Sequence, residues 1–189
     1  MNASTLEHPQ TCTAFVGSRR LAAGSLAEVA LAVSQALQAD PLAAVLVFDD
    51  QTARPVELDT RGDEAEVRAR YAPEPEAQRG RGRPKLGVVA REVTLLPRHW
   101  DWLSRQPGGA SVALRKLVDG ARSDVRGQAR EAQETAYRFM SAMGGDLPGF
   151  EEATRALFAS DQPGLEAQLA AWPVDLRDHV MRLAQGAWS

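Results

Sequence analysis

Residues 79–122, RGRGRPKLGVVAREVTLLPRHWDWLSRQPGGASVALRKLVDGAR, decide how the rest of the chain is divided. The pattern predicts a basic arm interrupted by glycine and proline, a short apolar strand, and two helices separated by Pro-Gly-Gly. Residues 79–138 hold 13 Lys+Arg against 6 Asp+Glu, whereas residues 1–78 and 139–189 are both acidic. A chain of net charge −3 therefore concentrates positive charge in its middle, which is typical of proteins that contact polyanions.

The arm has a four-residue core, Arg81-Gly82-Arg83-Pro84, which resembles the AT-hook. The resemblance implies an arm that lies along the narrow minor groove of A·T-rich DNA, where its arginines meet the most negative potential. The core is flanked by three further cations, Arg79, Lys85 and Arg91. No acidic residue interrupts positions 79–91, so binding should depend strongly on salt concentration. The alternative is a basic linker that binds nothing, since so short a core arises easily by chance.

The segment after the arm, residues 88–122, resembles the ribbon-helix-helix fold of the methionine and Arc repressors. The matching features are a strand that leads into Leu96-Pro97, a first helix with Trp100 and Leu103, a Gly109-x-Ser111 junction, and a second helix with Leu114, Leu117 and Val118. The resemblance implies a homodimer whose paired strands enter the major groove. It also implies that backbone N–H groups around Gly109 and Ser111 grip a phosphate, while Ser111 is expected to cap the second helix.

The strand departs from that repressor pattern in either register. With Leu96 pointing inward, Arg91 is the one outward residue that can hydrogen-bond base edges. The other register turns Glu92 and Thr94 outward, which suits DNA no better. Either the ribbon only dimerises and the arm binds DNA, or the strand is bulged. A plain strand packed on two helices is the remaining alternative.

Residues 1–71 predict a small ββαββ unit. Strands are expected at 11–17 and 19–24, followed by a helix at 25–38 with Ser25 as its N-cap and Glu28 completing a capping box. A buried strand at 43–50 and an antiparallel return at 54–62 complete the unit. Helical spacing resumes at 63–71.

Composition sets the other boundaries. Residues 72–87 are rich in proline, glycine and charge and are expected to form a linker arm. Residues 88–143 hold the ribbon-helix-helix-like segment with an extended helix. Residues 144–189 form an all-helical C-terminal region, with helices at 150–159, 164–171 and 174–186. The predicted fold class is therefore α+β.

Several classes of protein are disfavoured by composition. Hydrophobic residues make up 44% of the 189 residues, enough for a packed core, yet no stretch approaches the roughly 20 apolar residues of a membrane span. The single cysteine, Cys12, allows no internal disulfide and indicates a reduced, cytoplasmic setting. The first residues lack the basic and apolar regions of a signal peptide.

No pattern in the sequence points to catalysis, a metal or a cofactor. His8, His99 and His179 lie far apart without ligand spacing. Asp49 and Asp50, at a strand end, are typical of turn formers and solvated charges. Phosphate-binding glycine loops and the paired histidines of zinc proteases are both missing from the sequence. We therefore expect a protein that is not an enzyme.

Over nearly its whole length the chain resembles a bacterial family catalogued as a domain of unknown function, number 2239. The segments that carry the resemblance are TAFVGSRRLAAGSLAEVALAV (13–33), VLVFDD (45–50), GRGRPKLGVVAREVTLLPRHWDWL (80–103), ASVALRKLV (110–118) and AYRFMSAMGGDLPGFEEATRALF (136–158). The resemblance implies one evolutionary unit. No activity, ligand or catalytic residue is attached to that family.

Two hypotheses follow from the sequence. The first is a homodimeric DNA-binding protein, a transcriptional regulator or nucleoid-associated factor. Its expected contacts are Arg79, Arg81, Gly82, Arg83, Pro84, Lys85, Arg91, Gly109 and Ser111. The second is a non-catalytic scaffold protein whose basic middle docks on an acidic partner.

Overall fold

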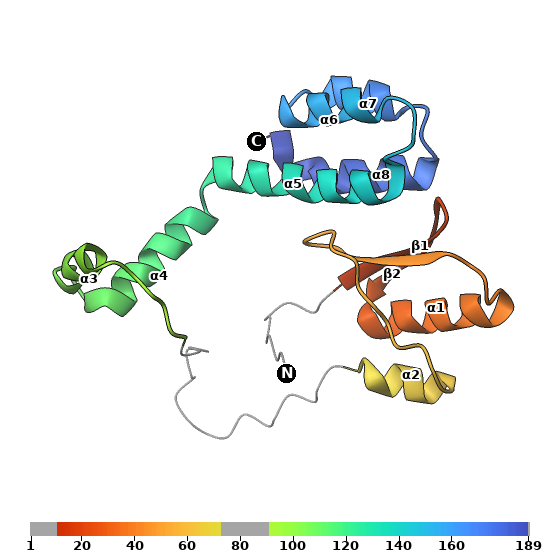
Figure 1. Ribbon diagram of the computed structural model, residues 1–189, viewed down its shortest axis with the longest axis horizontal. Helices are drawn as coiled ribbons and strands as arrows, with labels where there is room; N and C mark the ends of the chain where they lie inside the picture. Colours follow the sequence, from red (N-terminus) through yellow and green to blue (C-terminus); the bar gives the residue numbers. More distant parts are fainter. Residues whose placement is uncertain (1–10, 73–90, 189) are drawn as a thin grey trace. The chain divides into compact units, whose positions relative to one another are not determined.

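The computed structural model describes residues 11–72 and 91–188 (Figure 1). Their contacts divide the chain into two compact units. Unit 1 combines Met1–Ala72 with Gln128–Ser189, and unit 2 is Pro73–Gly127. The predicted fold class, α+β, is confirmed, since an antiparallel sheet lies in a chain that is otherwise mainly helical.

The sheet of unit 1 has three strands in the order β2-β1-β3. The central strand β1 (Thr11–Val16) pairs antiparallel with β2 (Arg19–Ser25) and with β3 (Val45–Asp49). Side chains alternate along β1, so Cys12 and Ala14 pack in one apolar cluster with Val29, while Phe15 packs in another. Both faces of the sheet are therefore covered, by α1 on one side and by α5 and α8 on the other (Figure 1).

The helices follow the predicted pattern closely. In the first part of unit 1 they are α1 (Leu26–Ala39) and α2 (Glu64–Arg70). α5 (Val125–Gly144) begins in the last residues of unit 2 and continues into unit 1. It is followed by α6 (Phe150–Phe158), α7 (Gln162–Leu169), α8 (Val174–Leu183) and a 3₁₀ turn, η1 (Ala184–Trp188). The expected capping box of α1 is confirmed: Glu28 N–H donates to Ser25 Oγ, and Ser25 N–H donates to the Glu28 carboxylate. Such caps typically contribute about 1 kcal/mol.

Unit 2 contains two helices in its described part, α3 (Pro97–Ser104) and α4 (Gly109–Arg122). Pro97 is the first residue of α3, as expected from its fixed φ. Gly108 and Gly109 both have positive φ, 86° and 76°, a conformation that favours glycine, so the Pro-Gly-Gly turn folds α4 back against α3.

Three local predictions are wrong. The return strand at 54–62 is reduced to a single bridge between Phe48 and Pro55, flanked by two bonds, from Val56 N–H to the Val47 carbonyl and from Asp49 N–H to the Arg54 carbonyl. Residues 91–96, the described part of the strand expected before Pro97, form no strand. Ser111 is not the cap of α4, which begins earlier, after Gly108.

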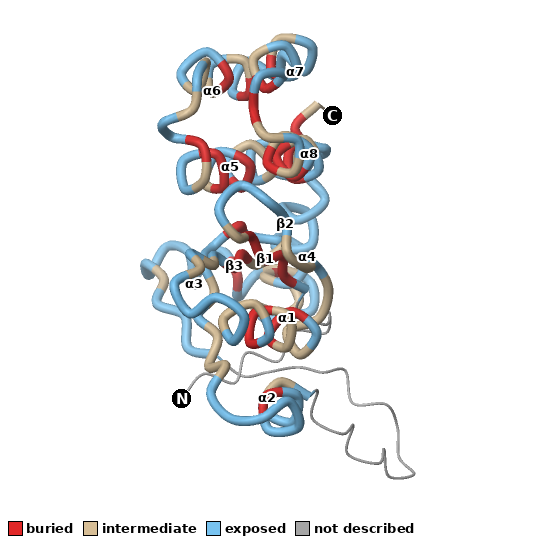
Figure 2. Tube along the Cα trace, turned by 90° about the vertical axis from the view of Figure 1, so that its right-hand side faces the viewer, coloured by how far each residue is buried: buried red, intermediate tan, exposed pale blue. Residues whose placement is uncertain are grey.

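The core of unit 1 joins parts of the chain that are far apart in sequence. Phe139 of α5 contacts Phe15 of β1, Phe48 of β3 and His179 of α8, with ring centroids 5.3, 5.1 and 4.4 Å away. All four side chains are buried. Figure 2 shows buried residues in β1, β3, α1, α5 and α8, whereas α3 and α4 are mostly exposed.

Gly144 lets the Trp172 ring pack close against α5, and we expect Gly144→Ala to destabilise unit 1. A methyl group there would lie 2.4 Å from two ring carbons of Trp172, which is 4% exposed and donates its indole N–H to the Pro148 carbonyl. The ring cannot move aside, so the expected cost is about 1–3 kcal/mol, measured as a lower Tm by circular dichroism.

Gly120→Ala is the control for Gly144→Ala. Gly120 is also inside a helix, but a methyl group there would have no neighbour within 4 Å. We expect this change to be neutral or to stabilise the helix by up to about 1 kcal/mol, because alanine is the better helix former. Equal destabilisation by the two substitutions would contradict the proposed Trp172 contact.

Candidate nucleic-acid interface

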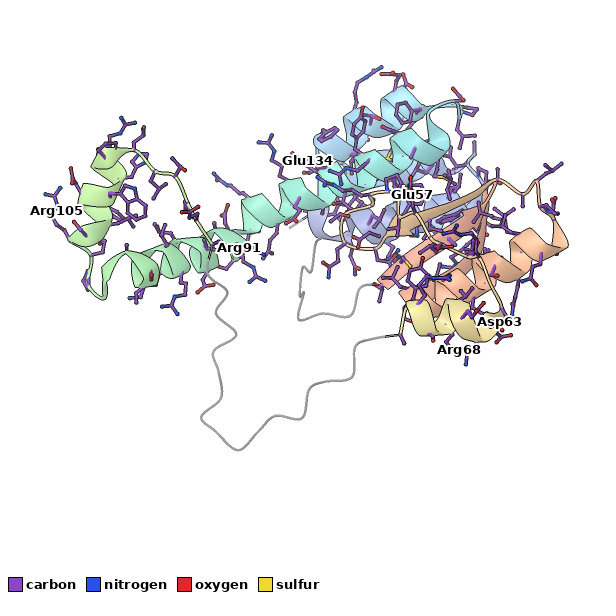
Figure 3. The ribbon with its side chains drawn as sticks, turned by 60° about the horizontal axis from the view of Figure 1, so that its bottom comes forward. Glu57, Asp63, Arg68, Arg91, Arg105 and Glu134 are labelled. Carbon is purple, nitrogen blue, oxygen red and sulfur yellow. The ribbon has the colours of Figure 1, made fainter. Side chains whose placement is uncertain are left out.

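The sequence-predicted DNA contacts lie in two places. Arg79, Arg81, Gly82, Arg83, Pro84 and Lys85 fall outside the described residues. Arg91, Gly109 and Ser111 are described, and all three belong to unit 2. Arg91 is exposed at the start of the segment that leads into α3 (Figure 3).

The first turn of α4 carries the two predicted phosphate contacts. Gly109 and Ser111 are the first and third residues of the helix, and the Ser111 side chain is exposed. The Gly109 N–H already donates to the Gln106 carbonyl at 3.0 Å. The N–H of Ser111 belongs to the first turn, where no intrahelical acceptor exists, so it can meet an anion.

The two sides of α4 differ sharply in chemistry. At 100° per residue, Ala113, Leu114, Leu117 and Val118 fall on one side, and the charged residues fall on the other. The charged side comprises Arg115, Lys116, Asp119 and Arg122. α3 adds Arg98 near its start, and Arg105 follows its last residue (Figure 3).

Two of these cations are held by backbone acceptors. Arg105 Nε donates to the Asp101 carbonyl at 2.9 Å, and Arg115 Nε donates to the Ser111 carbonyl at 3.1 Å. Both residues are exposed, and each bond uses one of the five N–H donors of a guanidinium. The side chains are thereby oriented while keeping donors for a phosphate.

The two units of the fold carry opposite net charge. Residues 73–127 hold 11 Lys+Arg and 6 Asp+Glu, a net charge of +5, whereas the residues of unit 1 hold 11 and 19, a net charge of −8. The basic region recognised in the sequence therefore coincides almost entirely with unit 2.

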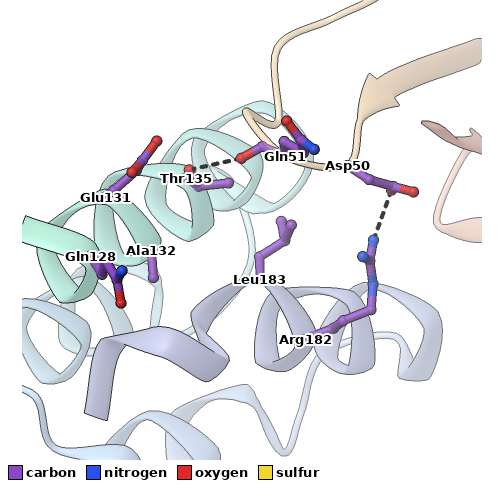
Figure 4. Close-up of a pocket in the computed structure, with 8 residues that line it drawn as sticks. All are labelled: Asp50, Gln51, Gln128, Glu131, Ala132, Thr135, Arg182 and Leu183. Atoms are coloured by element: carbon purple, nitrogen blue, oxygen red, sulfur yellow. Dashed lines mark hydrogen bonds and ion pairs between the residues drawn. The ribbon is translucent and has the colours of Figure 1, made fainter. Parts of the chain in front are cut away.

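Unit 1 contains a partly buried polar network that sequence reasoning missed. Asp50, directly after β3, accepts hydrogen bonds from Thr13 Oγ1 at 2.7 Å and from Arg182 Nη2 at 2.9 Å (Figure 4). The same Arg182 nitrogen lies 3.1 Å from His179 Nδ1. Asp50 was expected to be a solvated charge, but it instead ties the sheet to α8. The one signal in the sequence was a carboxylate at the end of a buried strand.

The turn that follows β3 adds contacts between this region and α5. Asp49 Oδ1 accepts from the N–H groups of Gln51 and Thr52, so the prediction that Asp49 forms a turn is confirmed. Thr135 of α5 donates to the Gln51 carbonyl at 3.4 Å, and Arg138 donates to the Thr52 carbonyl. A shallow cavity of about 250 Å³ remains beside the network, lined by Asp50, Gln51, Gln128, Glu131, Ala132, Thr135, Arg182 and Leu183 (Figure 4).

Two buried titratable groups of unit 1 have pKa values shifted from their usual range. Burial, reinforced by the Asp50 and Asp49 carboxylates, raises the pKa of the Cys12 thiol to about 11, so it is not a thiolate at neutral pH. Burial and the nearby Arg182 lower the pKa of His179 to about 4, and its ring is 3% exposed. Within residues 11–72 and 91–188, no group of three or more His, Cys, Asp and Glu side chains could hold a metal ion.

None of the helices in the described ranges is both long and apolar enough to cross a membrane. Among curated proteins and among solved structures, no relative matches the chain. The model of one protein family does match, over residues 11–184, and that family is described as an uncharacterised protein conserved in bacteria. The match spans both units, from β1 to the end of α8, and the chain therefore belongs to this bacterial family, DUF2239.

Proposed function

We propose that this protein is a cytoplasmic, homodimeric DNA-binding protein, a transcriptional regulator or nucleoid-associated factor. The observation that carries the proposal is the separation of charge, in which one small unit of net charge +5 belongs to a chain of net charge −3. Positive charge concentrated on one unit favours binding to a nucleic-acid backbone, whereas evenly spread charge would not.

The arm supplies the groove contact in this proposal. Arg81 and Arg83 enter the minor groove of A·T-rich duplex, Gly82 lets the backbone approach the groove floor, and Pro84 keeps the arm extended. Arg79 and Lys85 meet the flanking phosphates. None of these contacts needs a folded partner element, which suits residues in a Pro- and Gly-rich segment.

Unit 2 adds phosphate contacts that fix the protein on the duplex. Arg91 continues the basic run of the arm, and the first turn of α4 presents the N–H of Ser111 beside Gly109. Exposed cations on α3 and α4, such as Arg98 and Lys116, extend the same positive surface. These contacts carry no base information, so sequence preference would come from the groove width read by the arm.

The scaffold hypothesis is the second candidate, and the opposite charge of the two units favours it. A basic unit and an acidic unit on separate molecules attract one another. On this alternative, unit 2 would bind acidic protein surfaces, and duplex DNA would compete only weakly for binding to unit 2.

Fluorescence anisotropy with A·T-rich and G·C-rich duplexes tests the proposal. We expect Arg81→Ala with Arg83→Ala to weaken binding to A·T-rich duplex at least about tenfold, and to reduce the slope of log K against log salt by about 2, because two phosphate-region cations are lost. The matched control is Arg68→Ala with Arg155→Ala, which removes two exposed arginines from unit 1. It should leave the slope unchanged.

Two results would count against the proposal. If the unmodified chain binds no duplex even at low salt, DNA binding is wrong and the scaffold hypothesis gains. If binding is normal but the arm substitutions change nothing, the arm has no part in the mechanism, and the contacts on α3 and α4 must account for it.

A further inference from the structure

An open apolar groove runs between the two helices of unit 2. It has a volume of about 270 Å³ and is lined by Leu95, His99, Trp102, Leu103, Leu114 and Leu117. Trp102 is 49% exposed and Leu117 is 53% exposed, so the groove is open to solvent. Val118, next to it on α4, is 55% exposed. We refer to these seven residues as the apolar groove.

The described part of unit 2 buries few side chains while this groove is uncovered. In its described part, residues 91–127, the buried side chains are Leu103 and Ala113. Its two helices have 8 and 14 residues, lengths that are marginal in water without tertiary packing. Val93, Leu96 and Trp100 leave still more apolar surface exposed. An apolar surface packed on the groove would therefore stabilise the described part of unit 2.

We infer that a second copy of this chain covers the groove, with α3 and α4 of the two copies packed against each other. The groove wall carries no acidic residue, lysine or arginine, and the charged residues of α4 lie on the opposite side of that helix. Two such faces can meet about a twofold axis without placing like charges together. Twofold contact covers both grooves at once and closes the assembly, so no apolar face remains to recruit further copies.

The segment before α3 also fits a contact with a second copy of the chain. Residues 91–95 precede an extended Leu96 and include Val93 and Thr94, which are β-branched. Within the described residues, their backbone N–H groups have no hydrogen-bond partner. The same segment of a second copy would offer antiparallel partners for these groups beside the covered groove.

This inference deepens the proposed function, and its role in DNA binding rests on it. A dimer carries two basic arms, so once one arm is bound the second binds at a high effective concentration. The surface that joins the copies and the surface that meets DNA are separate, because the cations of α4 lie on the side away from the groove.

Sedimentation velocity of the full chain tests the inference. We expect the unmodified chain to be a dimer at micromolar concentration and Leu117→Asp to raise the dimer Kd at least about 100-fold, because a carboxylate would be buried in an apolar contact. The control is Lys116→Asp, which places the same new side chain on the charged side of α4 and should leave the chain dimeric. A monomeric unmodified chain, or a dimer unaffected by Leu117→Asp, would overturn the inference.

A second readout does not depend on the folding of a groove variant. Association buries the half-exposed Trp102 indole, so dilution of the unmodified chain should shift tryptophan emission to longer wavelength, and Trp102→Phe should remove most of that shift. Emission that stays constant through the dissociation range would contradict a groove contact. A monomer that still binds duplex DNA refutes only the groove contact, whereas a dimer that binds no duplex refutes only the proposed function.

Discussion

Phe139→Ala is expected to destabilise unit 1 by about 3–5 kcal/mol, the usual cost of removing a fully buried phenylalanine. The Phe139 ring is 0% exposed and lies between Phe15, Phe48 and His179, which come from β1, β3 and α8. Its removal leaves a cavity that a rigid sheet and two helices cannot fill. A loss of this size approaches the total stability of many small domains.

Although the substitution is in α5, we expect it to lower the stability of the sheet as well. Hydrogen exchange of the β1 amides measures this directly, and we expect protection there to fall together with that of α5 and α8. Glu134→Ala, an exposed change on the same helix, is the control and should alter stability by less than about 0.5 kcal/mol. Intact β1 protection in Phe139→Ala would show that the sheet and the helices are not one cooperative core.

Acidification is the second change with a large expected effect, and it acts through His179. Burial first, and then Arg182 and Arg20, lower the pKa of His179 from 6.5 to about 4, while Asp50 opposes the shift. The unfolded chain therefore takes up this proton at higher pH than the folded chain does. Stability is highest when the ring is neutral in both states, and it falls as the pH drops from about 6.5 towards 4.

The expected loss is about 2 kcal/mol at pH 5 and about 3 kcal/mol at pH 4, relative to neutral pH. Urea unfolding between pH 4 and pH 7.5 measures it. His179→Phe keeps a ring against Phe15 and Phe139 but cannot titrate, so its stability should fall less over the same range. Parallel pH profiles for the two proteins would show that other groups cause the acid sensitivity.

Much of the secondary structure could be predicted because it depends on neighbouring residues. The capping box at Ser25 and Glu28, the helix start at Pro97 and the Pro-Gly-Gly turn each act over a few positions, and each element begins where its signal stands or within two residues of it. Two of the three errors arose where strand pairing was needed. Residues 54–62 have β-favouring positions, yet they meet β3 in a single bridge, because pairing depends on the tertiary placement of both segments.

The candidate interface was likewise predicted only in those features that depend on neighbouring residues. The predicted phosphate contacts Gly109 and Ser111 do occupy the first turn of α4, because a glycine turn fixes where that helix starts. The apolar groove was not predicted: periodicity marked Leu114, Leu117 and Val118 as one apolar side of a helix, and only the structure shows that Leu117 and Val118 remain half exposed. The network of Asp50, Arg182 and His179 left one signal in the sequence, a carboxylate at the end of a buried strand.

By itself the sequence determined the order and type of most elements, the basic middle of the chain and the apolar side of each helix, since all of these depend on residues within a turn or two of one another. Only the tertiary structure decided that the two ends of the chain share one core, where Phe15 meets Phe139 and Arg182 binds a carboxylate 132 residues away. The physical reason is that the hydrophobic effect is not directional. It requires these side chains to be buried, but their partners are set by how the sheet and helices pack.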